Sequence, residues 1–301
     1  MACRSRRSQA TSQSRGASPL RPLGLAKPAP SGPPCGLALE PNLDFGGVGA
    51  LLEVRDLSVR FGGVVALDRV SFGVDAGQVV ALIGPNGAGK TTLFNVITRV
   101  YRPSAGTVLI DGRSVLSIRP HHVIRHGLAR TFQNVALFRS MTVLENVIVG
   151  DHMRTKSGWL QASVPLPGAL AAESESRKRA LEMLDFVGLG ARADHPVAVL
   201  PFGMQKRVEL ARALVSRPRV LLLDEPAGGI SHEEVDAMAR LLRRVHTDLG
   251  VTMLLVEHHM AFVMGISDHV VVLDFGRKIG EGTPAEVQRN PAVIEAYLGA
   301  A

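Results

Sequence analysis

The chain has 301 residues and a net charge of +7, and its length allows one large domain or two small ones. Residues 1–50 hold six basic and two acidic side chains, so four of the seven excess positive charges lie there. The remainder has an ordinary charge balance, which does not indicate a nucleic-acid-binding face. Both cysteines, Cys3 and Cys35, lie in this first stretch, which excludes a cysteine-based zinc site in the rest of the chain. No apolar run approaches the ~20 residues that span a bilayer.

Residues 1–49 form a predicted disordered extension, because they are rich in Ser, Arg, Pro and Gly and lack hydrophobic periodicity. An Arg- and Ser-rich start is also typical of an organelle transit peptide, but the prolines oppose the amphipathic helix that such a peptide needs. We favour a dispensable tail or a start codon assigned too far upstream. The folded domain is expected over residues 50–301.

Beyond Leu51 the apolar residues fall mainly at a period of two, which is typical of half-buried strands. This alternation ends at Phe61, directly before Gly62-Gly63. A bend there leaves the ring either exposed, and able to stack on a planar base, or packed in the core.

A glycine-rich run follows the apolar strand pattern of residues 79–83 and precedes apolar residues at helical spacing: Gly84-Pro85-Asn86-Gly87-Ala88-Gly89-Lys90-Thr91-Thr92. This strand, loop and helix order is the context of a phosphate-binding loop, whereas a plain glycine-rich turn does not require it. The glycines let backbone N–H groups turn toward a triphosphate, and the following helix presents its positive dipole end. The Lys90 ammonium reaches the β and γ phosphates, and Thr91 offers a hydroxyl to Mg²⁺.

The next strand candidates are residues 107–110 and 128–132, and the second of these is followed by Gln133. Taken alone, Gln133 reads as a surface amide. Residues 137–217 are expected to be mostly helical, with a loop over residues 157–170 around Trp159.

A further apolar strand pattern, residues 220–223, ends in Asp224-Glu225. Burying two adjacent carboxylates at a strand end costs free energy unless a cation lies beside them, and magnesium is the natural candidate. Asp224 suits the Mg²⁺ shell and Glu225 suits a base that polarises an attacking water. A helix N-cap at the strand end is the structural alternative.

Ser231 with Glu234 predicts a capping box, and Gly250 closes the helix that it opens. The strand pattern of residues 251–256 then ends before His258, where ligands sit in doubly wound folds. A strand over residues 270–273 and a hairpin over residues 276–282 follow. Thr283-Pro284-Ala285-Glu286 is then expected to cap a C-terminal helix, and Asn290-Pro291 to start a last short one.

The order of these parts resembles the ATPase subunit of an ABC transporter over about residues 51–299. The parts are the phosphate loop, Gln133, a helical insert, the run Leu200-Pro201-Phe202-Gly203-Met204-Gln205, the Asp224-Glu225 strand and His258. The resemblance implies an α/β P-loop NTPase fold of RecA-like type, with an antiparallel β subdomain and a helical insert over about residues 137–217.

In that family two cassettes close head to tail around two ATP molecules. The resemblance implies that Phe61 stacks on adenine, that Gln133 senses Mg²⁺ and the attacking water, and that His258 contacts the γ-phosphate. The stretch of Phe202, Gly203 and Met204 would face the ATP of the partner. Residues near 134–150 would meet a membrane subunit.

Several phrases are similar to the branch that imports branched-chain and other hydrophobic amino acids, among them Ala129-Arg130-Thr131-Phe132-Gln133 and Asn290-Pro291 through Tyr297-Leu298-Gly299. The chain departs from the usual Leu-Ser-Gly-Gly-Gln signature, because Pro201, Phe202 and Met204 replace its Ser, first Gly and Gln.

The resulting hypothesis is an ATP- and Mg²⁺-dependent ATPase subunit that drives import of these amino acids. Its expected partners are integral membrane permease subunits, a second ATPase subunit and, indirectly, an extracytoplasmic solute-binding protein, with no nucleic acid. Its expected location is peripheral, on the cytoplasmic face of the plasma membrane. The alternatives are transport of another solute such as urea, an amide or a lipid, a soluble ABC-type ATPase, and a phosphotransferase.

Overall fold

The computed structural model describes residues 50–131, 135–152 and 167–298. The expectations for residues 1–49, Gln133 and Trp159 fall outside these ranges. In chain order the elements are β1 (Leu52–Phe61), β2 (Val64–Val74), β3 (Val79–Ile83), α1 (Lys90–Ile97), β4 (Ala105–Ile110), β5 (Arg113–Ser114), η1 (Val115–Ser117), η2 (Pro120–His126), β6 (Leu128–Arg130), α2 (Val143–Asp151), α4 (Pro167–Phe186), η3 (Gly190–Arg192), η4 (Val197–Val199), α5 (Phe202–Leu214), β7 (Val220–Asp224), α6 (His232–Leu249), β8 (Thr252–Val256), α7 (Met260–Ile266), β9 (His269–Asp274), β10 (Arg277–Gly282), α8 (Pro284–Arg289) and α9 (Pro291–Leu298).

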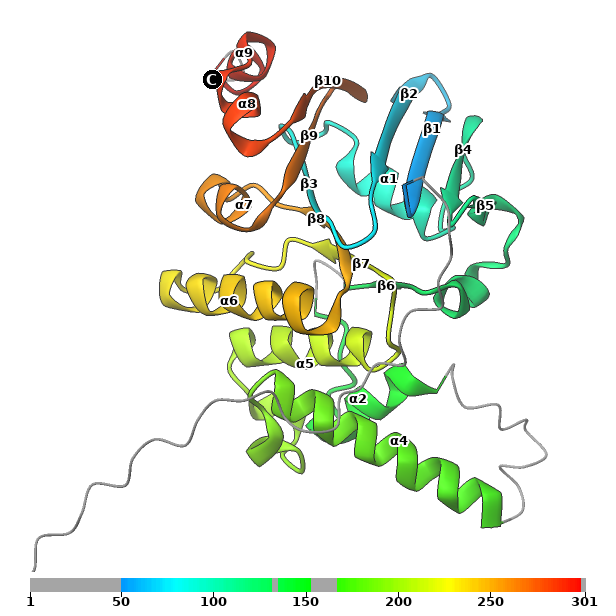
Figure 1. Ribbon diagram of the computed structural model, residues 1–301, viewed down its shortest axis with the longest axis vertical. Coiled ribbons are helices and arrows are strands. Elements are labelled where there is room, and N and C mark those ends of the chain that lie inside the picture. Colours follow the sequence, from blue (N-terminus) through cyan, green and yellow to red (C-terminus); the bar gives the residue numbers. More distant parts are fainter. Residues whose placement is uncertain (1–49, 132–134, 153–166, 299–301) are drawn as a thin grey trace, which may run out of the picture. The chain divides into compact units, whose positions relative to one another are not determined.

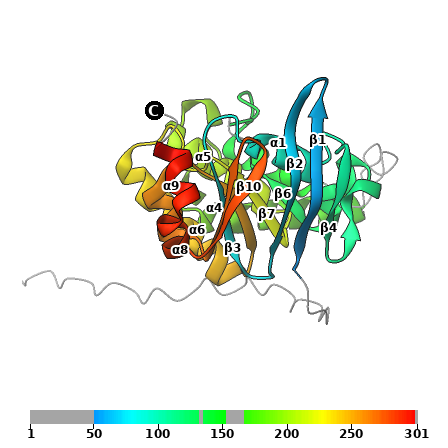
Figure 2. The same ribbon diagram turned by 90° about the horizontal axis from the view of Figure 1, so that it is seen from above.

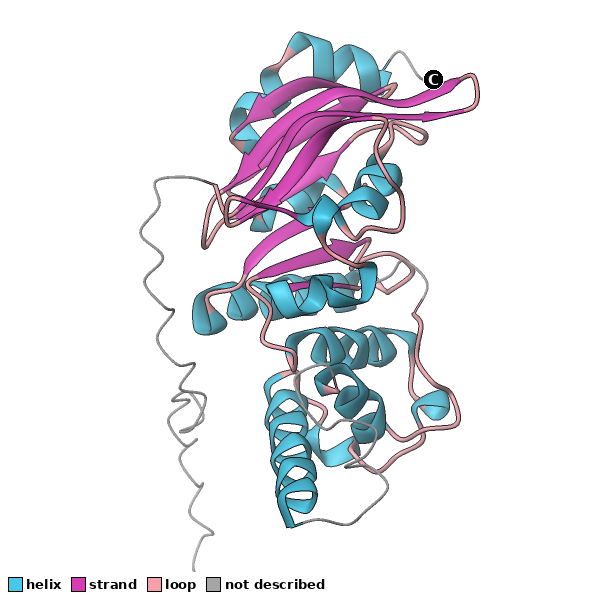
Figure 3. Ribbon diagram, turned by 90° about the vertical axis from the view of Figure 1, so that its right-hand side faces the viewer, coloured by secondary structure: helices cyan, strands magenta, loops and turns pink. Residues whose placement is uncertain are grey.

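The described strands form two sheets. A six-stranded sheet has the order β10-β9-β3-β8-β7-β6, and all its neighbours are parallel except β10, which pairs antiparallel at one edge. A four-stranded antiparallel sheet has the order β2-β1-β4-β5. Figure 3 shows most of the strands gathered toward one end of the domain and a group of helices at the other. Every residue of β3, β7 and β8 is buried, as their continuous apolar runs predict for central parallel strands. The predicted α/β fold with an antiparallel part is confirmed.

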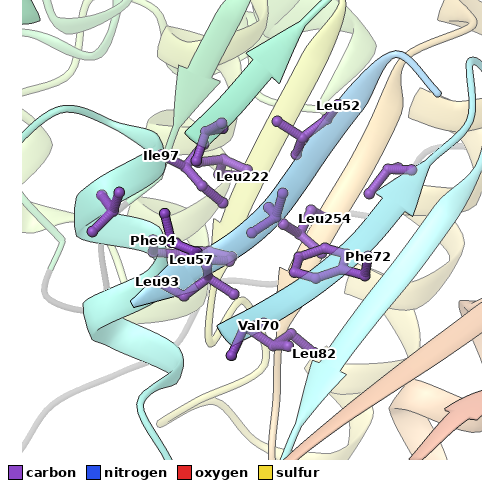
Figure 4. Packing of buried hydrophobic residues seen from close by; sticks show 14 of the residues in the cluster. Leu52, Leu57, Val70, Phe72, Leu82, Leu93, Phe94, Ile97, Leu222 and Leu254 are labelled. Carbon is purple, nitrogen blue, oxygen red and sulfur yellow. The ribbon is translucent and has the colours of Figure 1, made fainter. Parts of the chain in front are cut away.

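The main core lies where both sheets meet α1 (Figure 4). Leu93 and Phe94 of α1 are fully buried, together with Leu57 of β1 and Leu82 of β3. Burying a side chain of this size contributes about 1.5–3 kcal/mol. Packing on two sides fixes α1, and with it the loop that precedes α1.

The predicted helical region consists, in its described parts, of α2, α4, α5 and two short 3-10 turns. The helices α2, α4 and α5 pack on one another at the end of the domain away from β1 and β2 (Figure 1). The loop predicted to reach Leu170 is shorter than expected, because α4 begins at Pro167. Proline is accepted in the first turn of a helix, where its missing N–H costs nothing.

Local capping signals are confirmed along the chain. Ser231 and Glu234 form a capping box at the start of α6, and Gly250 ends that helix in the left-handed conformation. Thr283 and Glu286 form a second box at α8, which packs with α9 beside β10 (Figure 2). Within the described ranges, no helix combines the length and apolar character needed to cross a membrane.

Candidate functional site

Three parallel strands end at the same edge of the six-stranded sheet, and a predicted site residue follows each of them. β3 leads into the glycine-rich loop, β7 ends at Asp224 before Glu225, and β8 is followed by His258. β3 and β7 both pair with β8 in parallel. Ligands bind at the carboxyl ends of strands in open α/β sheets. The fold therefore gathers groups that lie far apart in the sequence.

The loop between β3 and α1 has a shape that requires glycine at two positions. Gly84 has a φ of 150°, and a Cβ there would lie 2.1 Å from the carbonyl oxygen of Leu273. Gly89 has a φ of 98° and is the N-cap of α1. A Cβ at Gly89 would lie 2.6 Å from the carbonyl oxygen of Ala66. Any larger residue would displace the backbone that is expected to cradle phosphate.

The side chains of the loop differ in exposure. Ala88 is buried in the core, so only its backbone is available to a ligand. Residues of the loop that reach the surface are the exposed Asn86, Gly87 and Thr91 and the half-buried Pro85, Gly89, Lys90 and Thr92. The exposed Thr91 hydroxyl is therefore accessible at the start of α1.

The Lys90 side chain folds back over its own loop. Its Nζ donates to the carbonyl oxygens of Gly84 at 2.6 Å and Pro85 at 2.8 Å. Burial lowers the pKa of Lys90, and the negative charge of Glu225 partly opposes that shift. The charge of Glu225 thus acts on the ammonium of the glycine-rich loop.

Asp224 has a cationic partner within the chain. Its Oδ2 accepts a 2.8 Å hydrogen bond from Arg130, and both side chains are at most 8% exposed. Arg130 also donates to Asn95 Oδ1 at 2.8 Å and to Thr98 Oγ1 at 3.2 Å. The cost of burying Asp224, which the sequence argument assigned to magnesium, is offset here by a guanidinium.

Glu225 adopts a strained backbone conformation that its neighbours hold in place. Its φ is 49°, in the left-handed region, which costs a non-glycine residue about 1–3 kcal/mol. Its N–H donates to the Val256 carbonyl at 2.9 Å, and its own carbonyl accepts from Lys206 Nζ at 2.6 Å. The N-cap alternative for this residue is wrong, because Ser231 is the N-cap of the next helix.

His258 lies beside Glu225, with 3.9 Å between His258 Nδ1 and Glu225 Oε1. Its side chain is 66% exposed, so the imidazole is accessible to a ligand. The neighbouring Glu257 is buried; its Oε1 accepts from the Ala227 N–H at 2.7 Å and its Oε2 from the His258 N–H at 3.1 Å. The Glu257 carboxylate therefore joins the segment that follows Glu225 to the backbone of His258 through two hydrogen bonds.

Phe61 lies at the end of β1 and is 45% exposed, so its core alternative is wrong. Its ring meets Tyr101 edge to face, with 5.2 Å between the ring centroids. Such an arrangement leaves a ring face available for stacking.

Phe202, Gly203 and Met204 form the first turn of α5. A Cβ on Gly203 would lie 2.2 Å from Glu234 Oε1 in the capping box of α6, so a side chain at this position would force that carboxylate to move. Phe202 is 43% exposed. In the part of the chain that the structure describes, no hydrogen bond or ion pair joins these residues to the glycine-rich loop.

The donor set fits magnesium when the substrate completes it. Among the described residues, no three acidic, histidine or cysteine side chains gather into a metal site. Mg²⁺ prefers one or two carboxylates together with substrate phosphate oxygens over a cage made only of protein ligands. The Thr91 hydroxyl and the Asp224 carboxylate match that requirement, and Gln133 lies outside the described residues.

Four residues at this site were missed by the sequence argument: Arg130, Lys206, Glu257 and Tyr297. A charged residue inside an apolar strand pattern was a signal for Arg130, and one directly after such a pattern was a signal for Glu257. Burial raises the pKa of Tyr297 to about 12, opposed by a hydrogen bond with the backbone of Gly84. The C-terminal helix α9 therefore contacts the glycine-rich loop.

The sequence matches the family described as "ABC transporter" over residues 67–228. Residues 277–301 match the family described as "Branched-chain amino acid ATP-binding cassette transporter". The chain is 42% identical over 251 residues to the high-affinity branched-chain amino acid transport ATP-binding protein BraF of Pseudomonas aeruginosa, covering 83% of this chain and 98% of that protein. It is 41% identical to the corresponding protein LivG of Escherichia coli, with the same coverage.

Solved structures agree with the fold. A nucleotide-free ATP-binding cassette from an ABC transporter is 31% identical, with a TM-score of 0.72 over 82% of this chain and 98% of that chain. The ADP conformation of MJ1267, an ATP-binding cassette of an ABC transporter, is also 31% identical with a TM-score of 0.72, over 83% and 98%.

Proposed function

The chain belongs to the ABC transporter ATPase family, and from this premise we propose that it is the ATP-binding subunit of an importer for branched-chain or other hydrophobic amino acids. Members of this family hydrolyse ATP to drive transport. The substrate class rests on the names of the relatives and on the C-terminal family match, since an ATPase subunit does not contact the solute.

Within this proposal, residues 84–92 bind the phosphates of ATP. The backbone N–H groups of Gly87 and Gly89 and the dipole of α1 attract negative charge. The Lys90 ammonium exchanges its bonds to loop carbonyls for the β and γ phosphates. Phe61 stacks on the adenine ring.

Glu225 orients and deprotonates the attacking water, and the His258 imidazole at 3.9 Å from it contacts the γ-phosphate. Thr91 and Asp224 would hold Mg²⁺, with Gln133 as a further ligand and sensor. When bound, the ion neutralises developing charge on the phosphates. The base contributes ~10²–10⁴ to the rate in reactions of this kind.

The turn of Phe202, Gly203 and Met204 faces the ATP of a second ATPase subunit. This assignment is supported by the lack, among described residues, of any bond from this turn to the chain's own loop. Membrane permease subunits and an extracytoplasmic binding protein complete the assembly. The chain then lies peripherally on the cytoplasmic face of the membrane, with residues 50–301 as the ATPase domain and residues 1–49 as an extension.

The single observation that carries the ATPase proposal is that β3, β7 and β8 run parallel and end at one edge of the sheet, where the glycine-rich loop, Glu225 and His258 follow them. The transport proposal is tested by reconstituting the full chain with its co-expressed membrane subunits and binding protein in vesicles. We expect leucine, isoleucine or valine to stimulate ATP hydrolysis and to accumulate inside. Stimulation by urea or an amide alone would assign another solute, and hydrolysis that no solute changes would favour a non-transport ATPase.

A further inference from the structure

A hollow lies at the opposite edge of the six-stranded sheet from the phosphate loop. Its volume is about 520 Å³, and it opens beside the amino ends of β6 and β7 and the turn between β4 and β5. Because β6, β7, β8 and β3 run parallel, the amino ends of β6 and β7 lie away from the edge where β3 enters the loop. This hollow is therefore separate from the candidate ATP site.

Four arginines line this hollow: Arg113, Arg125, Arg217 and Arg219. Its one carboxylate belongs to Asp111 and already pairs with Arg219, at 3.1 Å. The side chains of the other three arginines have no ion pair or hydrogen bond with any described residue. Three uncompensated guanidinium groups around one concavity produce a positive potential that attracts anions.

Several residues around these arginines have backbone conformations that few residue types adopt. Arg217 has a φ of 51° and Asp111 a φ of 52°, so both sit in the left-handed region that costs a non-glycine residue energy. Gly127 has a φ of 81°, and a Cβ there would lie 3.2 Å from the Cβ and Cγ of Arg219. The Arg219 N–H also donates to the Gly127 carbonyl at 2.8 Å. The backbone positions of Arg217 and Arg219 are thus held by their neighbours, which reduces the entropy that a bound anion must restrain there.

The lining of the hollow also has an apolar part. Ile110, Ile118 and Ile124 line it together with the arginines. Small-molecule sites combine apolar walls with a few placed polar groups and have volumes of about 300–1,000 Å³. Guanidinium groups match phosphate geometry through paired N–H donors. The combination suits a ligand that has both a phosphate group and a planar or apolar body.

We propose that this hollow binds a phosphorylated small molecule of nucleotide size, at a site distinct from the phosphate loop. The arginines hold the phosphates, and the three isoleucines pack against the planar body. The proposal is independent of the solute that the transporter moves.

The experiment uses the full chain carrying Lys90→Ala, which weakens binding at the phosphate loop, and measures binding by calorimetry. The probes are GDP, pyrophosphate and guanosine, which separate the phosphates from the planar body. We expect GDP to bind with a Kd below about 1 mM, more tightly than pyrophosphate, and guanosine to give no measurable heat. Absence of GDP binding at millimolar concentration would overturn the proposal.

Two variants locate the site. In the Lys90→Ala background, Arg113→Gln with Arg217→Gln should weaken GDP binding at least tenfold, because two charge-assisted contacts are lost. The matched control is Arg240→Gln with Arg289→Gln, two exposed arginines on α6 and α8 that should leave binding unchanged. Equal weakening by both pairs, or by neither, would contradict the assignment.

The last measurement tests binding to anionic lipid vesicles, because a membrane surface also presents phosphate groups to the arginines. If Arg113→Gln with Arg217→Gln abolishes sedimentation with phosphatidylglycerol vesicles while GDP shows no binding, the hollow contacts lipid and the small-molecule proposal is wrong. An unchanged circular dichroism spectrum is required of each variant, so that loss of binding is not loss of fold.

Discussion

The Lys206 ammonium donates a 2.6 Å hydrogen bond to the backbone carbonyl of Glu225. Lys206 lies one turn into α5, the helix that begins with Phe202, Gly203 and Met204. The helix expected to meet a second subunit is thus bonded directly to the residue expected to act as base. Burial lowers the pKa of Lys206, and the charges of Glu257, Glu209, Glu225 and Asp224 partly oppose the shift.

We expect Lys206→Met to lower kcat by about 10- to 100-fold with less than about a threefold change in KM for ATP. The reason is that the strained Glu225 backbone loses a partner, and small displacements of a catalytic group have effects of this size. Lys206→Arg should restore most of the rate, and the exposed Lys178→Met serves as the control. A stably folded Lys206→Met with the kcat of the parent would remove Lys206 from the catalytic apparatus.

Arg130→Met should destabilise the fold by about 3–5 kcal/mol, because it leaves Asp224 charged and buried without its partner. Urea unfolding followed by circular dichroism measures this change. The matched control is Arg277→Met, which breaks a more exposed ion pair with Asp68 and should cost at most about 1 kcal/mol. Equal urea midpoints for the two variants would show that the buried ion pair contributes no more to stability than the exposed one.

The capping box of α2 predicts a pH effect on stability. The backbone N–H and side-chain hydroxyl of Thr142 hydrogen-bond to Glu145 and lower the pKa of that carboxyl. Because the pKa of Glu145 is lower in the folded state than in the unfolded state, its hydrogen bonds stabilise the fold fully at pH values above the unfolded-state pKa of 4.5. This stabilisation is lost as the pH falls through the folded-state pKa. The urea midpoint should therefore fall less between pH 7 and pH 3 in Glu145→Gln than in the parent. Parallel curves would count against this linkage.

The elements that depend on local signals could be predicted from the sequence. The phosphate loop, the strand ends and the capping boxes at Ser231 and Thr283 are encoded in neighbouring residues, and the structure has them where they were expected. Turn chemistry and capping act over only three or four residues, so no knowledge of the fold was needed.

The partners of the site's charges could not be predicted in the same way. Arg130 and Asp224 are 94 residues apart, and they meet only because β6 and β7 are neighbours in the sheet. Likewise, Glu257 reaches the Ala227 N–H across 30 residues. A carboxylate at the end of a buried apolar strand needs a cation, and that need is visible in the sequence at Asp224; the strand order of the sheet decides that the cation is Arg130.

The central claim is that Lys90 and its loop bind ATP while Glu225 hydrolyses it, and the most direct measurement compares ATP binding with single-turnover hydrolysis in two variants. Glu225→Gln should bind ATP within about threefold of the parent affinity while hydrolysis falls at least ~10²-fold. Lys90→Ala should instead weaken ATP binding itself. Near-normal hydrolysis by Glu225→Gln would contradict the account, as would an unchanged ATP affinity in Lys90→Ala.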